Sequence, residues 1–293
     1  MEAAVAFGGE IVSCDSVQVY RGLDVGSGKP SVEDRALVPH HLVDILDMEH
    51  EMNAAMFAQR AAGSIEGIIS RNRLPIVTGG TGLYLTALLK GLFEQPAPNP
   101  EVRARLETLA ARRGSERLHR LLAAKDPVYA AKTAPADRIR VVRALEVCFS
   151  TGRPFSIAQQ ERRSAYAGEA LVVGLQPTRN ELRERVLVRV RQMLSAGLVE
   201  ETRRALARVP RGGAVPRALG AIGYREVVAR LATHSLGPLG DDELQRVIVT
   251  STMQYAKRQM TYFRHQFDVE WFAENAPALS RIGAFVRQEG RSH

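Results

Sequence analysis

The residues best suited to chemistry follow a short apolar stretch near the start of the sequence. Ile11-Val12 is typical of the end of a buried strand, and the segment from Asp15 to Gln18 comes directly after it. Ligands of an open α/β sheet bind at the carboxyl ends of its parallel strands, so Asp15 is placed to act on a substrate. Gln18 and Tyr20 are within reach of a base the size of adenine. The alternative is that Asp15 only caps a turn or a helix, as Asp often does.

A glycine-rich turn offers a second chemical group. Residues 74–78 (LPIVT) are typical of a buried strand, and Gly79-Gly80-Thr81-Gly82 follows it. Glycines let the backbone approach a ligand closely. Thr81 stands at the start of an expected helix, residues 83–90, so it either contacts a ligand or serves only as the N-cap of that helix.

The charge balance favours an anionic partner. Forty Lys and Arg against 32 Asp and Glu give a formal net charge of +8, with a pI near 9.9. Such a protein binds phosphate-rich partners through salt-sensitive contacts, whereas an even spread of arginines would only solvate the surface. Clustering favours RNA over that alternative. The clusters are Arg103 with Arg105, Arg112-Arg113, Arg138 with Arg140 and Arg143, and Arg162-Arg163.

Composition excludes other classes. The chain has 293 residues, 45% hydrophobic and 25% charged, as expected for a soluble globular protein with one core domain and an insertion. No apolar run approaches the roughly 20 residues that span a bilayer, and the first residues lack the pattern of a secretory signal. Cys14 and Cys148 lie far apart, which favours reduced thiols in the cytoplasm. We expect no membrane partner and a monomer.

The elements that must position these groups are read from hydrophobic periodicity and from caps. Residues 1–8 resemble the last turns of a helix closed by glycine, and 31–38 a polar turn or short helix. The paired His40-His41 opens a loop that leads into a strand ending at Ile45. With no third ligand at helical spacing, these histidines are interpreted as structural rather than metal-binding. Further strands are predicted at 171–175 and 269–272, a hinge at 95–100, helices at 54–71, 101–113, 116–124, 137–150, 180–207 (interrupted at Gly197) and 241–264, and a frayed tail after residue 285.

Six stretches of this chain together resemble the tRNA dimethylallyltransferase (tRNA isopentenyltransferase) family. They are residues 9–30, 39–44 (PHHLVD), 79–84 (GGTGLY), 143–147 (RALEV), 223–226 (GYRE) and 257–259 (KRQ), in the order in which the family has them. The resemblance implies an α/β fold with a P-loop NTPase-like parallel sheet flanked by helices. It implies that residues 1–95 and 169–293 form the core, and that 96–168 are a helical insertion that contacts tRNA.

The implied activity is transfer of a dimethylallyl group from dimethylallyl diphosphate to N6 of adenosine 37, beside the anticodon in the tRNA anticodon stem-loop, with Mg²⁺ as cofactor. Asp15 is expected to be the general base. Thr81 and Arg103 match family residues near the reacting centre, so both are implied to be catalytic and to bind the diphosphate. The residues expected to bind tRNA are Asp15, Ser16, Val17, Gln18, Arg140, Arg143, Gly223, Tyr224 and Arg225.

Two of these expectations have their own physical argument. Arg140 and Arg143 stand at i and i+3, so one helix face presents both to phosphate, unless they pair with neighbours such as Glu146. Tyr224 and Arg225 are expected to stack on or pair with a nucleotide.

The sequence departs from the family at its start. No Gly-x-x-x-x-Gly-Lys-Ser/Thr phosphate loop occurs, because the run from Gly26 to Pro30 has Leu23 in place of its first glycine and Pro30 in place of Ser or Thr. We expect the reading frame upstream of Met1 to encode an apolar strand and this loop; the alternative is a chain that has lost both. The alternative functions are a tRNA-binding remnant without catalysis and a small-molecule phosphotransferase of the same fold.

Overall fold

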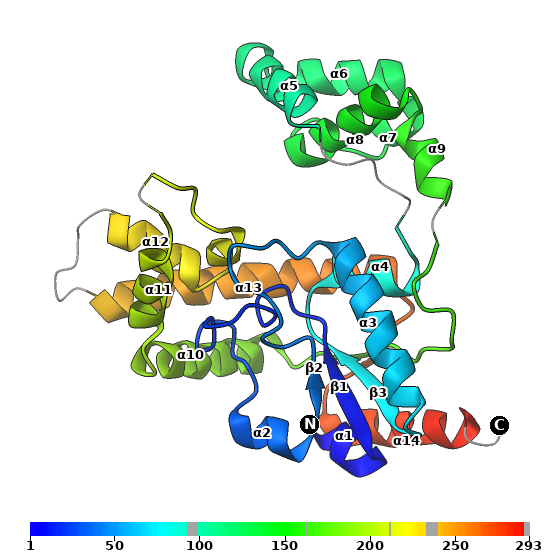
Figure 1. The fold of residues 1–293 in the computed structure, drawn as a ribbon, viewed down its shortest axis with the longest axis vertical. Helices are drawn as coiled ribbons and strands as arrows, with labels where there is room; N and C mark the ends of the chain where they lie inside the picture. The colour runs from blue at the N-terminus through cyan, green and yellow to red at the C-terminus, as the bar shows by residue number, and fades with distance from the viewer. Residues whose placement is uncertain (93–98, 162, 211, 233–239, 290–293) are drawn as a thin grey trace. The chain divides into compact units, whose positions relative to one another are not determined.

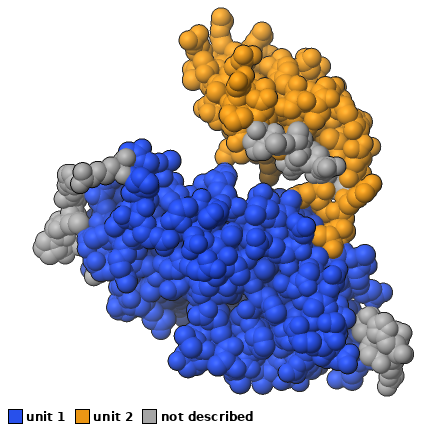
Figure 2. All heavy atoms as spheres, viewed as in Figure 1, with its two compact units in different colours: residues 1–88, 166–293 blue, residues 89–165 orange. Residues whose placement is uncertain are grey.

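A computed structural model describes residues 1–92, 99–161, 163–210, 212–232 and 240–289 (Figure 1). The chain forms two compact units, which Figure 2 shows in different colours. Unit 1 contains residues 1–88 and 166–293, and unit 2 contains residues 89–165. The unit boundaries therefore fall at 88/89 and 165/166, where the sequence analysis placed them at 95/96 and 168/169.

A small parallel sheet forms the centre of the first half of unit 1. Its strand order is β2-β1-β3, with β1 at Gly9–Ser13, β2 at His40–His41 and β3 at Leu74–Thr78. β1 is buried along its whole length, and its partners put Val12 opposite His41 on one side and Val77 on the other. All three strands run in the same direction, so their carboxyl ends meet at one edge of the sheet.

Helices connect and cover these strands. α1 (Glu2–Phe7) ends at Gly8, whose φ of 62° is the left-handed conformation that glycine adopts without a steric penalty. α2 (Val32–Leu37) has a capping box built on Ser31. α3 (Ala54–Ile69) is capped by Asn53 and packs its apolar face on β1 and β3. α4 (Gly82–Leu89) follows β3 through the glycine-rich turn.

The second half of unit 1 is mostly helical. α10 (Arg179–Ser195) and α11 (Leu198–Ala207) are separated at Gly197, whose φ is 96°. The short 3₁₀ helix η2 (Arg217–Gly220) leads to α12 (Tyr224–Ala232), and α13 (Gly240–Gln266) packs along α10. A second parallel pair, β4 (Val173–Leu175) with β5 (Glu270–Phe272), lies against α14 (Asn275–Glu289). In the described part of the chain, β3 pairs only with β1, and β4 only with β5.

Unit 2 is a helical body with its own core. Its elements are α5 (Pro100–Arg113), α6 (Ser115–Lys125), α7 (Pro127–Ala130), α8 (Arg138–Thr151), α9 (Phe155–Ala158) and η1 (Gln159–Glu161). α8 is its central helix, because it packs on α5, α6 and α9 and is buried from Val141 to Cys148 except at Arg143. The core is formed by Leu106, Leu118, Leu122, Leu145 and their neighbours.

The structure confirms the α/β class and most of the predicted elements, and it corrects two of them. The predicted strand after His40 is shorter than expected, because positive φ angles at Leu42 (62°) and Asp44 (56°) end the extended conformation. The predicted frayed tail is wrong up to Glu289, since α14 continues to that residue. Residues 95–98 of the predicted hinge, and Arg162, lie outside the described residues. Among the described helices, none has both the length and the apolar character needed to cross a membrane.

Candidate active site

Asp15 lies at the carboxyl edge of the sheet, two residues after β1 ends. Its Oδ1 accepts hydrogen bonds from the backbone N–H groups of Val17 (2.7 Å) and Gln18 (3.2 Å). Within the described residues its Oδ2 has no hydrogen-bond partner. Asp15 therefore does cap a turn, and the same cap fixes the carboxylate so that one oxygen stays free to accept a proton.

Thr81 lies beside this turn and is connected to it. The Ser16 N–H donates to the Thr81 hydroxyl oxygen (3.1 Å), and the Thr81 N–H donates to the Cys14 carbonyl (3.2 Å). The Cys14 thiol lies 3.7 Å from the Thr81 carbonyl, and burial, followed by the nearby Asp15 charge, raises the pKa of that thiol to about 12. The Thr81 hydroxyl oxygen thus accepts a hydrogen bond from the segment that follows β1. Asp15 and Thr81 therefore lie at the same edge of the sheet.

The glycines of the turn make this close approach sterically possible. A Cβ on Gly79, whose φ is 153°, would lie 2.3 Å from the Cys14 carbonyl oxygen, and one on Gly80 would lie 2.0 Å from Gln259 Nε2. That Gln259 amide donates to the Gly80 carbonyl at 2.8 Å. Gln259 belongs to the long helix α13, so this hydrogen bond fixes the loop that carries Thr81 to α13.

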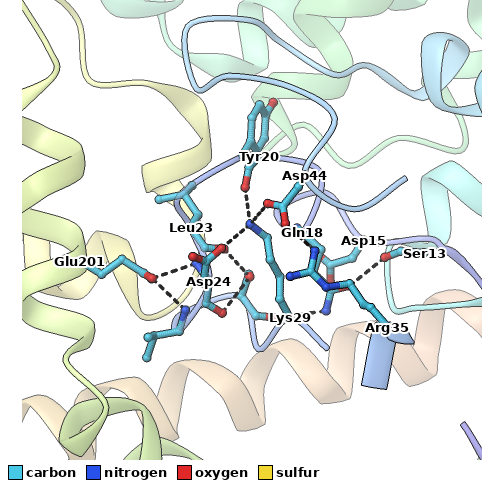
Figure 3. A network of polar contacts seen from close by, with 12 residues as sticks. Ser13, Asp15, Gln18, Tyr20, Leu23, Asp24, Lys29, Arg35, Asp44 and Glu201 are labelled. Atoms are coloured by element: carbon cyan, nitrogen blue, oxygen red, sulfur yellow. Dashed lines mark hydrogen bonds and ion pairs between the residues drawn. The ribbon is translucent and has the colours of Figure 1, made fainter. Parts of the chain in front are cut away.

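A buried lysine organises the loop that follows Asp15 (Figure 3). Lys29 has a 3% exposed side chain, and its ammonium donates to the Tyr20 carbonyl (2.5 Å), Asp24 Oδ1 (2.6 Å) and Asp44 Oδ1 (2.5 Å). Arg35 donates to the other Asp44 oxygen at 2.8 Å. A buried ammonium with three acceptors is a satisfied ion, so the loop is fixed to the segment that follows β2.

A buried carboxylate holds the same loop from the side of α11 (Figure 3). Glu201 accepts from three successive backbone N–H groups, those of Asp24 (2.9 Å), Val25 (2.9 Å) and Gly26 (3.1 Å). Three converging N–H groups are an arrangement that protein backbones use to bind anions. The Tyr224 hydroxyl donates to Glu201 at 2.6 Å, and a Cβ on Gly26 would lie 2.5 Å from the Tyr224 ring.

These contacts engage Tyr224 within the protein. Its side chain is completely buried, so stacking of its ring on a nucleotide would require that it leave these contacts. Burial, and then the hydrogen bond to Glu201, raise the pKa of Tyr224. Tyr20, which the sequence placed within reach of a base, is also buried, and its hydroxyl oxygen accepts from the Met52 N–H (3.1 Å).

The amide of Gln18 is engaged within the protein. The Ser13 hydroxyl donates to Gln18 Oε1 (2.8 Å), and Gln18 Nε2 donates to the carbonyls of Ser27 (3.4 Å) and Gly28 (3.2 Å). Contact between Gln18 and a base therefore requires that these bonds be exchanged. Ser16 is exposed and Val17 half-buried at the same turn.

Gly223 and Arg225 lie at the start of α12. The Gly223 N–H donates to Glu226 Oε2 (2.7 Å), and Arg225 Nε donates to Glu226 Oε1 (2.7 Å). The Arg225 side chain is 45% exposed, so its guanidinium remains accessible beside the carboxylate. Both residues stay predicted RNA contacts.

Unit 2 brings together Arg103 and Arg143 around Glu146. Glu146 Oε2 accepts from Arg103 Nη2 (2.8 Å) and Arg143 Nη1 (2.9 Å), and Oε1 accepts from the Asn99 N–H (2.9 Å). Burial favours the neutral carboxyl, but these three donors outweigh it, and the pKa of Glu146 is lowered. Arg140 is not part of this group; it pairs with Asp137 at 3.3 Å on the surface.

The sequence analysis did not identify Glu201, Lys29 or Arg189. The exposed Arg189 guanidinium packs over Gly28, with Nη2 2.3 Å from where a Cβ would stand, and it has no ion-pair partner among the residues described. Lys29 was overlooked because it lies in residues 26–30, which do not match a phosphate loop. Glu201 was overlooked because a single acidic residue in an amphipathic helix does not stand out in the sequence.

A carboxylate and a threonine lie at the carboxyl edge of a parallel sheet, in a chain with a separate arginine-bearing helical unit, an arrangement of the P-loop-like α/β class. The chain belongs to the IPP transferase family, whose family model matches residues 18–266.

The relatives agree. The chain is 46% identical to the tRNA dimethylallyltransferase of Geobacter metallireducens, over 92% of this chain and 86% of that protein. It is 45% identical to the tRNA dimethylallyltransferase of Thermomicrobium roseum, over 99% and 87%. The crystal structure of the tRNA isopentenylpyrophosphate transferase of Bacillus halodurans superposes with a TM-score of 0.66 at 32% identity, over 98% of this chain and 90% of that one. A eukaryotic dimethylallyltransferase acting on tRNA shares the fold (TM-score 0.74, 24% identity, 92% and 68% covered).

Proposed function

We propose that this chain transfers a dimethylallyl group from dimethylallyl diphosphate to N6 of adenosine 37, beside the anticodon of tRNA, in the cytoplasm and as a monomer. The names of its relatives support the reaction. The observation that carries the proposal is the geometry of Asp15. Two backbone N–H groups fix one of its oxygens, no described residue bonds the other, and Ser16 in the same turn donates to Thr81.

The reaction is a substitution at an allylic carbon. The N6 amine forms a bond to C1 of the dimethylallyl group, the bond from C1 to the diphosphate oxygen breaks, and the diphosphate leaves with the bonding electrons. The amine gains positive charge as it attacks, so it must lose a proton. Asp15 Oδ2 is the acceptor we assign to that proton.

The leaving diphosphate needs positive charge and hydrogen-bond donors. Thr81 and Arg189, both in unit 1, are the groups that we assign to this task. Arg103 lies in unit 2 beside Arg143, and we assign it to the RNA together with that residue. Across the described residues, no three His, Cys, Asp or Glu side chains converge in a way that would hold a metal by themselves. Mg²⁺ is commonly bound through substrate phosphates with few protein ligands, so an ion that arrives with the diphosphate would need little from this chain. The ion would neutralise charge on the diphosphate.

The target base must leave its stack so that its N6 amine can reach Asp15. Ser16, Val17 and the Asp15 turn are the surface that would receive it, and Gln18 would read its edge after exchanging its internal hydrogen bonds. Arg140 and Arg143 in unit 2, with Gly223 and Arg225 in unit 1, are proposed to bind the surrounding RNA backbone.

The proposal is tested with an anticodon stem-loop and labelled dimethylallyl diphosphate. We expect Mg²⁺-dependent transfer of label to the RNA, and digestion of the product should yield N6-(dimethylallyl)adenosine by mass spectrometry. The matched control carries inosine at position 37, which has an oxygen in place of the N6 amine and should receive no label.

The other outcomes separate the alternatives. Binding of the stem-loop without transfer would favour a tRNA-binding remnant. Transfer of phosphate to a small molecule without RNA would favour a phosphotransferase. Equal labelling of the inosine stem-loop would contradict the assignment of N6 as the acceptor.

A further inference from the structure

Glu146 is an acidic residue at the centre of a unit whose expected ligand is an anion. Its side chain is fully buried, although Glu is rarely buried unless it is paired. It lies in α8 one turn after Arg143, and its three partners come from two helices and from the residue that caps one of them. Removing a charged carboxylate from water costs free energy, which indicates that Glu146 has a role beyond filling the core.

One oxygen of Glu146 receives both guanidinium groups. Arg103 Nη2 and Arg143 Nη1 donate to Oε2 at 2.8 and 2.9 Å, so two cations that repel one another are held at a single atom. The other oxygen accepts from the Asn99 N–H, and the Asn99 side chain caps α5, the helix that carries Arg103. The carboxylate therefore fixes the start of α5 as well as both arginines.

Both arginines of this group stay partly accessible while they are paired. The lowered pKa of Glu146 keeps its carboxylate ionised through neutral pH, so it can hold both guanidinium groups. The Arg103 and Arg143 side chains are 42% and 21% exposed. Arg103 Nε is buried without a hydrogen-bond partner within the described residues. Both guanidinium groups are thus held in a fixed geometry with part of each side chain exposed, which is what preorganised anion binding requires.

We propose that Glu146 is a positioning residue that holds Arg103 and Arg143 as one preorganised pair, so that the contacts of both arginines with the tRNA substrate depend on it. This inference rests on the proposed function. Glu146 itself touches no substrate and acts through the two guanidinium groups. Because both share Oε2, a change at one arginine alters the restraint on the other.

The test is the affinity of the full chain for the anticodon stem-loop, measured by fluorescence anisotropy. Glu146→Gln removes one negative charge, so general electrostatics predicts tighter RNA binding. Positioning predicts the opposite, and we expect the Kd to rise about tenfold. Asp137→Asn is the matched control, because it also removes a negative charge beside an arginine at the start of α8 and keeps a side chain that can cap the helix. We expect its Kd to stay within about twofold.

A double-mutant cycle separates positioning from a general loss of structure. In the Glu146→Gln background, Arg143→Lys should weaken binding by less than about twofold, although it weakens binding by the wild-type chain much more. Thermal unfolding by circular dichroism checks each variant. If Glu146→Gln does not fold, the cycle of Arg103→Lys with Arg143→Lys decides, because both side chains are partly exposed and the pair should be strongly non-additive.

The outcomes are distinguishable. Failure of the wild-type chain to bind the stem-loop would contradict the proposed function, and the inference with it. Wild-type binding and transfer, together with a Glu146→Gln variant that binds as tightly as Asp137→Asn, would overturn the inference alone. Effects of Arg103→Lys and Arg143→Lys that multiply independently would overturn it as well.

Discussion

Each unit of this protein is built around a buried glutamate, and the two glutamates have different partners. Glu201 in unit 1 accepts from three backbone N–H groups and from the Tyr224 hydroxyl, all of them neutral. Glu146 in unit 2 accepts from two guanidinium groups and one backbone N–H. Both carboxylates are nearly inaccessible to solvent.

The difference in partners indicates a difference in purpose. Neutral N–H donors hold the shape of a backbone, so Glu201 fixes the loop from Asp24 to Gly26 that follows the Asp15 turn. Cationic donors carry charge, so Glu146 fixes the positions of two positive charges on unit 2. Replacing Glu201 should therefore affect mainly stability, and replacing Glu146 should affect mainly RNA affinity.

The largest expected effect on folding is at Glu201. Glu201→Gln places an NH₂ group against backbone N–H donors and leaves several of them unsatisfied, so we expect the free energy of unfolding to fall by about 3 kcal/mol. Urea denaturation measures this free energy. Glu200→Gln is the control, because Glu200 is exposed and, among the described residues, pairs with neighbours on its own helix. A loss below about 1 kcal/mol at Glu201 would remove the distinction between the two glutamates.

A smaller effect is expected at Lys29. Lys29→Met keeps the apolar stem but removes the cation from Asp44 and Asp24; Asp44 keeps Arg35, and Asp24 is 61% exposed. We expect the free energy of unfolding to fall by about 2 kcal/mol. Arg21→Met removes a cation from the exposed Asp47 pair and should change stability by less than about 0.5 kcal/mol. Equal effects of the two variants would show that burial of Lys29 carries no special weight.

The smallest effect is a pH dependence that comes from Glu10. This buried carboxylate on β1 accepts from Arg71 (2.8 Å) and contacts His41 (2.7 Å), and the hydrogen bond from Arg71 is the main cause that lowers the pKa of Glu10. Because the pKa of Glu10 in the folded state is below the ordinary value of 4.5, its ionised carboxylate stabilises the fold at pH values above 4.5. This stabilisation is lost as the pH falls through the lowered pKa.

Stability measured from pH 7 down to pH 3 should therefore fall less steeply below pH 4.5 for Glu10→Gln than for the wild-type chain. An identical slope for the two proteins would mean that the Glu10 carboxyl has the same proton affinity in the folded and unfolded states.

The sequence predicts local structure well where the evidence is local. The strand at Leu74–Thr78 and the helix start at Ala54 follow from apolar periodicity, and the break at Gly197 follows from a glycine, all within a few residues. Parallel strand order also brings Asp15 and Thr81 to one edge. The task of Glu201 was not predictable, because Glu201 and its partner Gly26 are 175 residues apart. The burial of Tyr224 has the same long-range cause.

The central claim is that Asp15 takes the proton from the attacking amine, and the most direct measurement is single-turnover transfer by Asp15→Asn at saturating stem-loop. Asn keeps an oxygen that can cap the turn, but it cannot accept the proton. We predict a rate lower by roughly 10²–10⁴-fold with a Kd for the stem-loop within about twofold of wild type. A rate and an affinity that fall by the same factor would contradict the claim and give Asp15 a purely structural role.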